Sequence, residues 1–384
     1  PNPKPQTPNP KPHFILTLLP EELLCEFKET SKTMDVTNIF NHLDISSSEI
    51  HQALEESKLF SLPPSLLCYN FISLGAKSST TFEIVAKHLF SGEMKLIRAY
   101  SKARLISHNK LEPLARSLRI GKQLGLFSFS LFQDELFFYT MSEFSGYPSL
   151  QDLIKSGIKL SENDYKFIAL GVLDCLQVLH DNGLILMDLS PKSIGFDQNG
   201  FPVILSFKSA VKINSQPNFL EFESFSTFLA PEILLSQPVE PSADLYSLGA
   251  ILHSLLFPAL HTSPSTLFSL FSRYFQSPLQ ISKDQIPEGL SLEFADFINR
   301  LIQPSETSRL GVYSVREVKE HPWLGVYKKK YQYRKDRKEG ITKWKNVKVS
   351  SDVSFLQSFG TRSDWNSEGS TLDESVLFDQ LIEE

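Results

Sequence analysis

Three side chains in the middle of the chain are of types that could act on a phosphate group or hold a metal ion. Asp188 stands in the run LMDLSPKS at 186–193, and its carboxylate could accept a proton from a hydroxyl group. Ser193 and Ser206 follow it, but Mg²⁺ prefers charged oxygen ligands and a serine hydroxyl is neutral. The only nearby carboxylate downstream, Asp197, lies in the predicted turn DQNG. The pattern therefore offers a proton acceptor without an evident metal site.

Two residues upstream could contact phosphate oxygens. Gly75 lies in the segment LGAKSST, where a residue without a Cβ atom lets backbone N–H groups approach a phosphate. Arg98 brings a permanent positive charge, with a donor geometry that differs from that of lysine. A structural role is the alternative for Arg98, as a local loop contact is for Asp188. The residue types by themselves leave these alternatives open.

Two regions with different predicted secondary structure must position these residues. Between 70 and 144, short β-rich runs predict strands, with one helix expected between Ser107 and Arg119. Beyond Ser149, the segments FIALGVLDCLQVLH and DLYSLGAILHSLL have apolar residues at helical spacing. A small β-rich region followed by a larger helical region predicts an α+β fold.

The order of several short motifs resembles the protein kinase superfamily, in the style of its AGC-like Ser/Thr kinases. In chain order these motifs are HDNGLILMDLSPKSIGFDQNGFPVILSFKSA from His180, APE at 230–232, D-x-YS-x-G from Asp244, SRLG at 308–311 and HPW at 321–323. The resemblance covers about residues 66–325. It implies a two-lobed protein-kinase-like fold, with a small β-rich lobe and a large helical lobe.

The resemblance also shows where the phosphate-handling residues depart from the family pattern. Asp188 takes the position of the catalytic base, whereas Ser193 and Ser206 replace the asparagine and the aspartate that bind magnesium. No metal ligand is therefore assigned, and Asp188 is expected to be vestigial. Losing one well-placed electrostatic stabiliser of a transition state costs about 10²–10³ in rate. The resemblance thus implies a pseudokinase, a kinase fold without ordinary phosphotransfer.

The expected nucleotide site of the small lobe is degenerate as well. Gly75 is the one glycine kept in the family's glycine-rich loop. Arg98 aligns with the strand lysine that family members pair with a helix glutamate, and Glu112 is the candidate partner here. Arg98 or Lys95 could replace that lysine in an unconventional enzyme.

The residues that stabilise the fold in the family are present in this sequence. The resemblance implies a buried ion pair between Glu232 and Arg309 that holds the activation segment to the large lobe. It also implies that Asp244 accepts hydrogen bonds from the catalytic-loop backbone and that Phe207 keeps an aromatic packing position.

Composition limits the remaining possibilities. The chain has 384 residues, 41% of them hydrophobic, and a formal net charge of −6, which gives no signature of nucleic-acid binding. Residues 325–348 carry ten Lys or Arg against two acids, and residues 349–384 carry eight acids against one Arg. The expected organisation is a Pro-rich linker at 1–12, an N-terminal helical extension at 13–65, a small lobe at 66–145, a large lobe at 146–325 and a charged C-terminal tail at 326–384.

The function expected from these observations is that of a catalytically inactive scaffold or allosteric regulator, which acts through other proteins and requires no cofactor. One alternative is an unconventional Ser/Thr kinase with weak ATP-dependent phosphotransfer through Asp188. The other is a sensor that binds ATP without Mg²⁺. The basic segment 328–348 could contact acidic protein or an anionic membrane. The three cysteines show no metal-binding pattern, which favours a cytoplasmic location with the nucleus as a second option.

Overall fold

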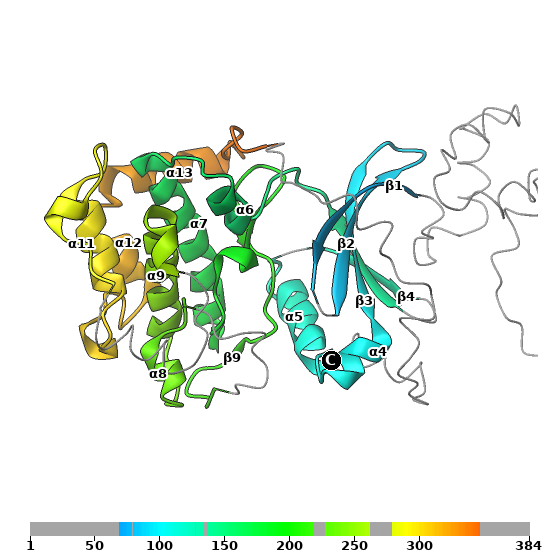
Figure 1. Cartoon of the computed structure of the whole chain (residues 1–384), viewed down its shortest axis with the longest axis horizontal. Coiled ribbons are helices and arrows are strands. Elements are labelled where there is room, and N and C mark those ends of the chain that lie inside the picture. The colour runs from blue at the N-terminus through cyan, green and yellow to red at the C-terminus, as the bar shows by residue number, and fades with distance from the viewer. Residues whose placement is uncertain are drawn as a thin grey trace, which may run out of the picture. The chain divides into compact units, whose positions relative to one another are not determined.

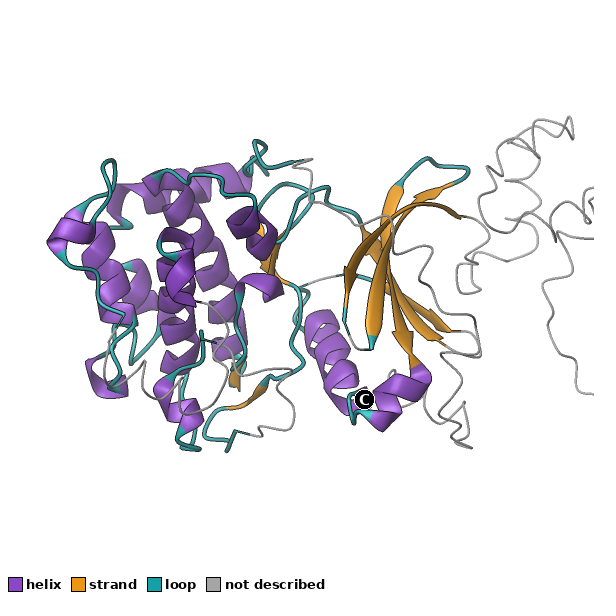
Figure 2. Ribbon diagram, in the orientation of Figure 1, coloured by secondary structure: helices purple, strands orange, loops and turns teal. Residues whose placement is uncertain are grey.

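The computed structural model describes residues 69–78, 80–126, 128–133, 137–217, 227–261 and 279–345. The expected Pro-rich linker at 1–12, the extension at 13–65 and the part of the charged tail beyond 345 lie outside these residues. Within the described chain, strands come first and helices follow, which gives the predicted α+β fold with a β-sheet lobe and a helical lobe (Figures 1 and 2).

The small lobe is built on one five-stranded sheet of order β1-β2-β3-β5-β4. Its strands are β1 (Tyr69–Lys77), β2 (Thr81–His88), β3 (Met94–Ser101), β4 (Ser130–Gln133) and β5 (Phe137–Glu143). β3 and β5 pair antiparallel in a register that places Arg98 opposite Thr140. The register fixes which side chains of neighbouring strands meet, and so decides the surroundings of Arg98.

Two helices follow β3, where the sequence predicted one helix between Ser107 and Arg119. They are α4 (Lys102–Ser107) and α5 (Leu111–Gln123), separated by a break at which Asn109 has a φ of +53°. A residue in this left-handed conformation ends a helix, and asparagine tolerates it better than most residues do. The two helices bury Leu105, Leu114 and Leu118 against Phe138 of β5. α5 corresponds to the helix predicted between Ser107 and Arg119, whereas α4, which precedes that range, was not predicted.

The large lobe contains most of the helices. They are α6 (Leu150–Lys155), α7 (Glu162–Asp181), α8 (Pro231–Leu234), α9 (Ser242–Leu256), α11 (Leu292–Leu301), α12 (Val315–Lys319) and α13 (Gly325–Asp336). α7 begins with a capping box between Ser161 and Asp164 and buries an apolar face that includes Phe167 and Leu173. α9 is buried along nearly its whole length, so it forms the centre of the lobe's core.

Four short strands in the large lobe flank the loops that contain the candidate site residues. β6 (Leu184–Ile185) pairs with β9 (Val211–Lys212), and β7 (Ile194–Phe196) pairs with β8 (Pro202–Ile204). The loop between β6 and β7 contains Asp188 and Ser193, and the segment between β8 and β9 contains Ser206. The candidate residues of the large lobe are therefore held between paired strands.

The charged segment after residue 325 packs onto the large lobe, at least as far as Lys345. α13 lies against α7, and Tyr331 is 4% exposed with its ring 5.3 Å from that of Phe167. Beyond α13, Trp344 is 1% exposed and its ring lies 5.3 Å from that of Phe196. The expectation of a tail from residue 326 is corrected for this part, because three of its aromatic and aliphatic side chains are buried.

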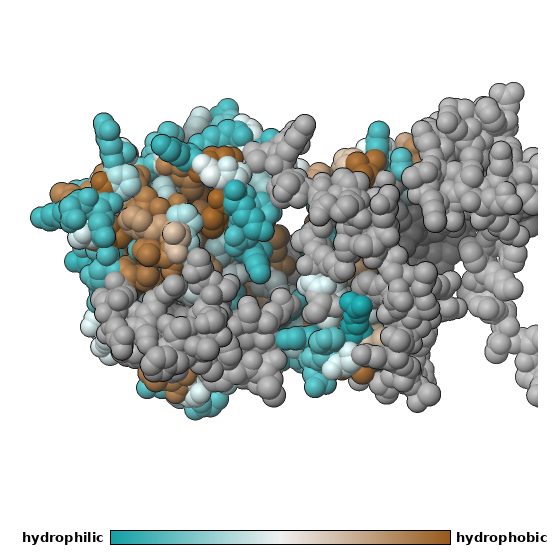
Figure 3. Space-filling model, viewed as in Figure 1, coloured by the Kyte–Doolittle hydropathy of each residue, from teal (hydrophilic) through white to brown (hydrophobic). Residues whose placement is uncertain are grey.

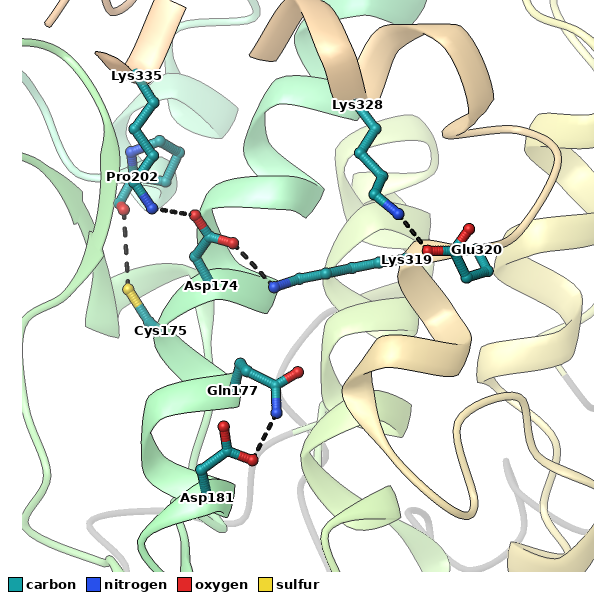
Figure 4. A network of polar contacts seen from close by, with 9 residues as sticks. All are labelled: Asp174, Cys175, Gln177, Asp181, Pro202, Lys319, Glu320, Lys328 and Lys335. Carbon is teal, nitrogen blue, oxygen red and sulfur yellow. Dashed lines mark hydrogen bonds and ion pairs between the residues drawn. The ribbon is translucent and has the colours of Figure 1, made fainter. Parts of the chain in front are cut away.

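Ion pairs around Asp174 of α7 also hold this segment. Asp174 accepts Lys319 of α12 at 2.9 Å and Lys335 of α13 on its other oxygen, so one carboxylate joins three helices (Figure 4). Lys328 of α13 pairs with Glu320 in the same view. The pairs of Asp174 are partly buried and that of Lys328 with Glu320 is exposed, and each is expected to stabilise the packing by about 1 kcal/mol or less.

Gly340 should be essential for docking the residues after α13. Its position leaves no room for a side chain, because a Cβ atom there would lie 1.9 Å from the backbone oxygen of Asn199. We expect Gly340→Ala to detach the segment around Trp344 and to lower the free energy of unfolding by about 3 kcal/mol, the cost of losing a large buried side chain. Hydrogen exchange of the amides at 337–345 would measure the detachment. Gly325→Ala is the matched control because nothing lies within 4 Å of its added methyl group, and equal protection in both variants would contradict the prediction.

Candidate functional site

A buried carboxylate accepts hydrogen bonds from the backbone of the loop that contains Asp188. Asp244, at the start of α9, is fully buried and accepts the backbone N–H groups of Leu186 and Met187, each at 2.9 Å. His180 at the end of α7 lies 2.8 Å from the same carboxylate. Met187 has a φ of +67°, a strained conformation for a side chain of this size, and the contact with Asp244 holds it there. The position of Asp188 is thus fixed by its neighbours' backbone.

The hydroxyl group of Ser193 is engaged within its own turn. It donates to the carbonyl oxygen of Ser190 at 2.9 Å and accepts the N–H group of Ser190 at 3.0 Å. Ser190 and Ser193 therefore cap the single 3₁₀ turn that starts at Pro191. A hydroxyl that already donates and accepts has little capacity left for a ligand.

The segment after Ser206 is attached to α5 through its backbone. Phe207 is fully buried in the core of the large lobe, and its N–H group donates to the Ser117 hydroxyl at 2.9 Å. Arg116 donates to the carbonyl oxygens of Lys208 at 3.3 Å and of Ala210 at 3.5 Å. Sequence reasoning missed both Ser117 and Arg116, because neither belongs to a motif with a fixed spacing.

Arg98 pairs with a strand residue and not with the expected helix residue. Its Nε atom donates to Glu83 on β2 at 2.7 Å, and both side chains are 23% exposed. Burial lowers the pKa of Arg98, but the charge of Glu83 and their hydrogen bond raise it above the ordinary value, so the guanidinium stays charged. The charge that could meet a phosphate is therefore largely neutralised.

Glu112 has different partners. It pairs with Arg116 one turn along α5 and with Arg119 at 3.3 Å, and it is 60% exposed. The predicted pairing of Arg98 with Glu112 is therefore wrong. The cross-strand position of Glu83 relative to Arg98 depends on the sheet register, which the sequence did not specify.

The other residues expected at the nucleotide site, Lys95 and Gly75, lie on strands of the small lobe. Lys95 forms an ion pair with Glu143, the residue opposite it on β5. Gly75 lies within β1, and Thr80, where the family usually has glycine, is 2% exposed. A threonine buried at this point fills space that a glycine would leave open.

Glu232 and Arg309 come together in a buried, two-pronged ion pair. The two nitrogen–oxygen distances are 2.6 and 3.0 Å, and neither side chain is more than 3% exposed. Arg309 also donates to the carbonyl oxygens of Ser242 at 2.9 Å and Gln303 at 3.1 Å, and its guanidinium lies 5.0 Å from the centre of the Tyr246 ring. Four of the five N–H donors of the guanidinium thus have partners, and such additional hydrogen bonds are the condition under which a buried pair is tolerated.

These donors do not fit a magnesium ion. The two positions that would hold it, Ser193 and Ser206, offer neutral hydroxyls, and that of Ser193 is already bonded to Ser190. Among the described residues, no three or more His, Cys, Asp or Glu side chains gather as a metal site would require. The described contacts of Asp244 and Ser193 hold the loop around Asp188 in place. No helix in the described part of the chain is long and apolar enough to cross a membrane.

Comparison with known proteins agrees with this frame. The sequence model of the protein kinase domain matches residues 127–324, just over half of the chain. Similar proteins include cGMP-dependent protein kinase isozyme 1 of Drosophila melanogaster, 25% identical over 198 residues that make up 50% of this chain and 25% of that protein. Serine/threonine-protein kinase sgk-1 of Caenorhabditis elegans is 26% identical over 50% of this chain and 42% of its own length. Protein kinase 2 of Dictyostelium discoideum is 28% identical over 52% and 40%.

Proposed function

The chain belongs to the protein kinase domain family, and on that premise we propose that it is a pseudokinase that acts as a protein-interaction scaffold or an allosteric regulator. The chain matches between a quarter and about two fifths of the length of the relatives described above, which are named as protein kinases. Their activity is not transferred to this chain, because the residues that would carry it differ here.

The ion pair between Arg98 and Glu83 is the observation that carries the proposal. Phosphoryl transfer relies on positioning and on charges aimed at the phosphates. The strand cation already has a carboxylate at 2.7 Å, so a phosphate would have to displace Glu83 and leave it beside new negative charge. Together with the neutral hydroxyls at Ser193 and Ser206, this ion pair favours a kinase fold that does not transfer phosphate.

The proposed function requires no cofactor, and its partners are other proteins and not nucleic acid. The surfaces offered are those of the large lobe, including the basic α13, and a cytoplasmic location is part of the proposal. ATP without Mg²⁺ remains compatible with the proposal, because neither Ser193 nor Ser206 supplies a charged metal ligand.

We expect ATP to leave the thermal midpoint of the chain unchanged, whether Mg²⁺ or EDTA is present. A ligand that binds only the folded state would stabilise it by about 2.7 kcal/mol at a hundredfold excess over its dissociation constant. For a domain of this size, each kcal/mol corresponds to a shift of about 2–4 °C. Differential scanning fluorimetry with millimolar ATP would therefore detect even a weak complex.

Each other outcome selects a different function. An equal rise with Mg²⁺ and with EDTA would indicate a metal-independent nucleotide sensor. A rise that requires Mg²⁺, followed by phosphotransfer that Asp188→Asn abolishes, would establish an unconventional Ser/Thr kinase and overturn the proposal.

A further inference from the structure

One face of α13 points away from the lobe and combines positive charge with exposed apolar surface. Val326, Lys329, Lys330, Tyr333 and Arg337 are spaced three or four residues apart, so they lie on the same side of the helix. Val326 is 88% exposed and Tyr333 is 59% exposed. We call these five residues the α13 face.

The positive charge of this face is not used by the packing of α13. The lysines that dock the helix have carboxylate partners on the lobe, as Lys328 does with Glu320 and Lys335 with Asp174 (Figure 4). Among the described residues, Lys329 and Lys330 form no ion pair, and the Nζ atom of Lys330 lies 5.8 Å from the centre of the Tyr327 ring. The margin of the helical lobe where α13 lies is mostly hydrophilic (Figure 3). The face therefore offers charge to a partner outside the described part of the chain.

The sequence of the same chain contains a segment of matching chemistry. Residues 371–384, TLDESVLFDQLIEE, carry five acids and no Lys or Arg. Their apolar residues Leu372, Val376, Leu377, Phe378, Leu381 and Ile382 are interspersed among these acids. The segment thus combines negative charge with apolar side chains, as the α13 face combines positive charge with Val326 and Tyr333.

We propose that the acidic segment 371–384 docks on the α13 face. The carboxylates would meet Lys329 and Lys330, and the apolar side chains would meet Val326 and Tyr333, while Arg337 already pairs with Glu339 at 3.0 Å. Twenty-five residues, 346–370, join the two partners. A chain of that length can extend about 3.3 Å per residue, far more than the roughly 18 Å length of a 12-residue helix.

The tether favours this occupant over an external one. A segment of the same chain faces its site at an effective concentration of about millimolar when a short connection joins the two. An anionic membrane would attract the α13 face but repel the five acids of 371–384, so the two parts of the chain would oppose each other there. An acidic partner protein would have to compete with the tethered segment at that concentration.

Zero-length carbodiimide crosslinking of the full chain, read by mass spectrometry, tests the proposal. We expect Lys329 and Lys330 to crosslink to carboxylates within 371–384 at least about fivefold more than Lys155 and Lys159, exposed lysines at the end of α6. The preference should fall at 0.5 M salt, because the Debye length shrinks from about 10 Å at 0.1 M to about 3 Å at 1 M.

Variants that leave the reacting lysines in place make the test specific. Val326→Ser with Tyr333→Ala removes the apolar part of the face and should reduce these crosslinks severalfold. Ile158→Ser, which also replaces an exposed apolar residue, should leave them unchanged. Crosslinks spread evenly over the exposed lysines, or insensitive to Val326 and Tyr333, would overturn the proposal. Binding of the intact chain to phosphatidylserine vesicles through Lys329 and Lys330 would also overturn it, because the face would then be open. The crosslinking and the vesicle-binding results do not depend on whether the chain binds ATP, so they test this proposal separately from the proposed function.

Discussion

Arg309→Ala should lower the free energy of unfolding by about 3–5 kcal/mol, the cost of leaving one member of a buried ion pair without its partner. Glu232 would remain at 3% exposure without the guanidinium that pairs with it. The carbonyl oxygens of Ser242 and Gln303 would lose their donor as well. Urea denaturation at neutral pH would measure the loss.

Two controls separate the effect of the pair from that of any charge change. Glu112→Gln removes an exposed partner of Arg116 and should cost about 1 kcal/mol or less. Replacing both buried partners, as in Glu232→Leu with Arg309→Met, should cost less than Arg309→Ala because no unpaired charge remains. A loss below about 1 kcal/mol for Arg309→Ala would show that the pair does not hold the lobe together.

Asp244→Ala should be the second most damaging single change and should act mainly on the loop around Asp188. It would leave the N–H groups of Leu186 and Met187 without an acceptor, and each unsatisfied buried group costs about 1–3 kcal/mol. The strained Met187 would lose the contact that holds its backbone. We expect a total loss of about 2–5 kcal/mol and faster hydrogen exchange at these two amides.

The conservative variant Asp244→Asn keeps one acceptor oxygen and should lose less stability than the alanine. Asp181→Asn provides a matched control, since Asp181 is an exposed residue at the end of α7 that accepts only the side chain of Gln177. Unchanged exchange at Leu186 and Met187 in Asp244→Ala would mean that the loop is held by other contacts.

Much of the fold follows from the sequence, because its main signals are local. The apolar spacing of the segments that become α7 and α9 predicts helices, and the β-rich runs before Ser149 predict the sheet. The ion pair of Glu232 with Arg309 follows from the motifs that the chain shares with kinases, although 77 positions separate the two residues.

The contacts that the sequence did not predict depend on tertiary placement. Glu83 meets Arg98 only because β2 lies beside β3 in a particular register, and a shift of one residue would turn it to the other face. The docking of α13 was hidden by its charge, since the buried Tyr331 and Trp344 are isolated among lysines and arginines. Their aromatic side chains could have indicated that they are buried, because aromatic residues seldom occur in a solvated tail.

The anchoring of the segment after Ser206 has an evolutionary consequence. Ser117 and Arg116 hold this segment through the N–H group of Phe207 and the carbonyl oxygens of Lys208 and Ala210. Backbone groups are present whatever the side chain, so substitutions at 206 and 208 leave these bonds in place. Selection for a folded domain alone would therefore not distinguish a serine from an aspartate at position 206, because the bonds that anchor the segment are the same for both.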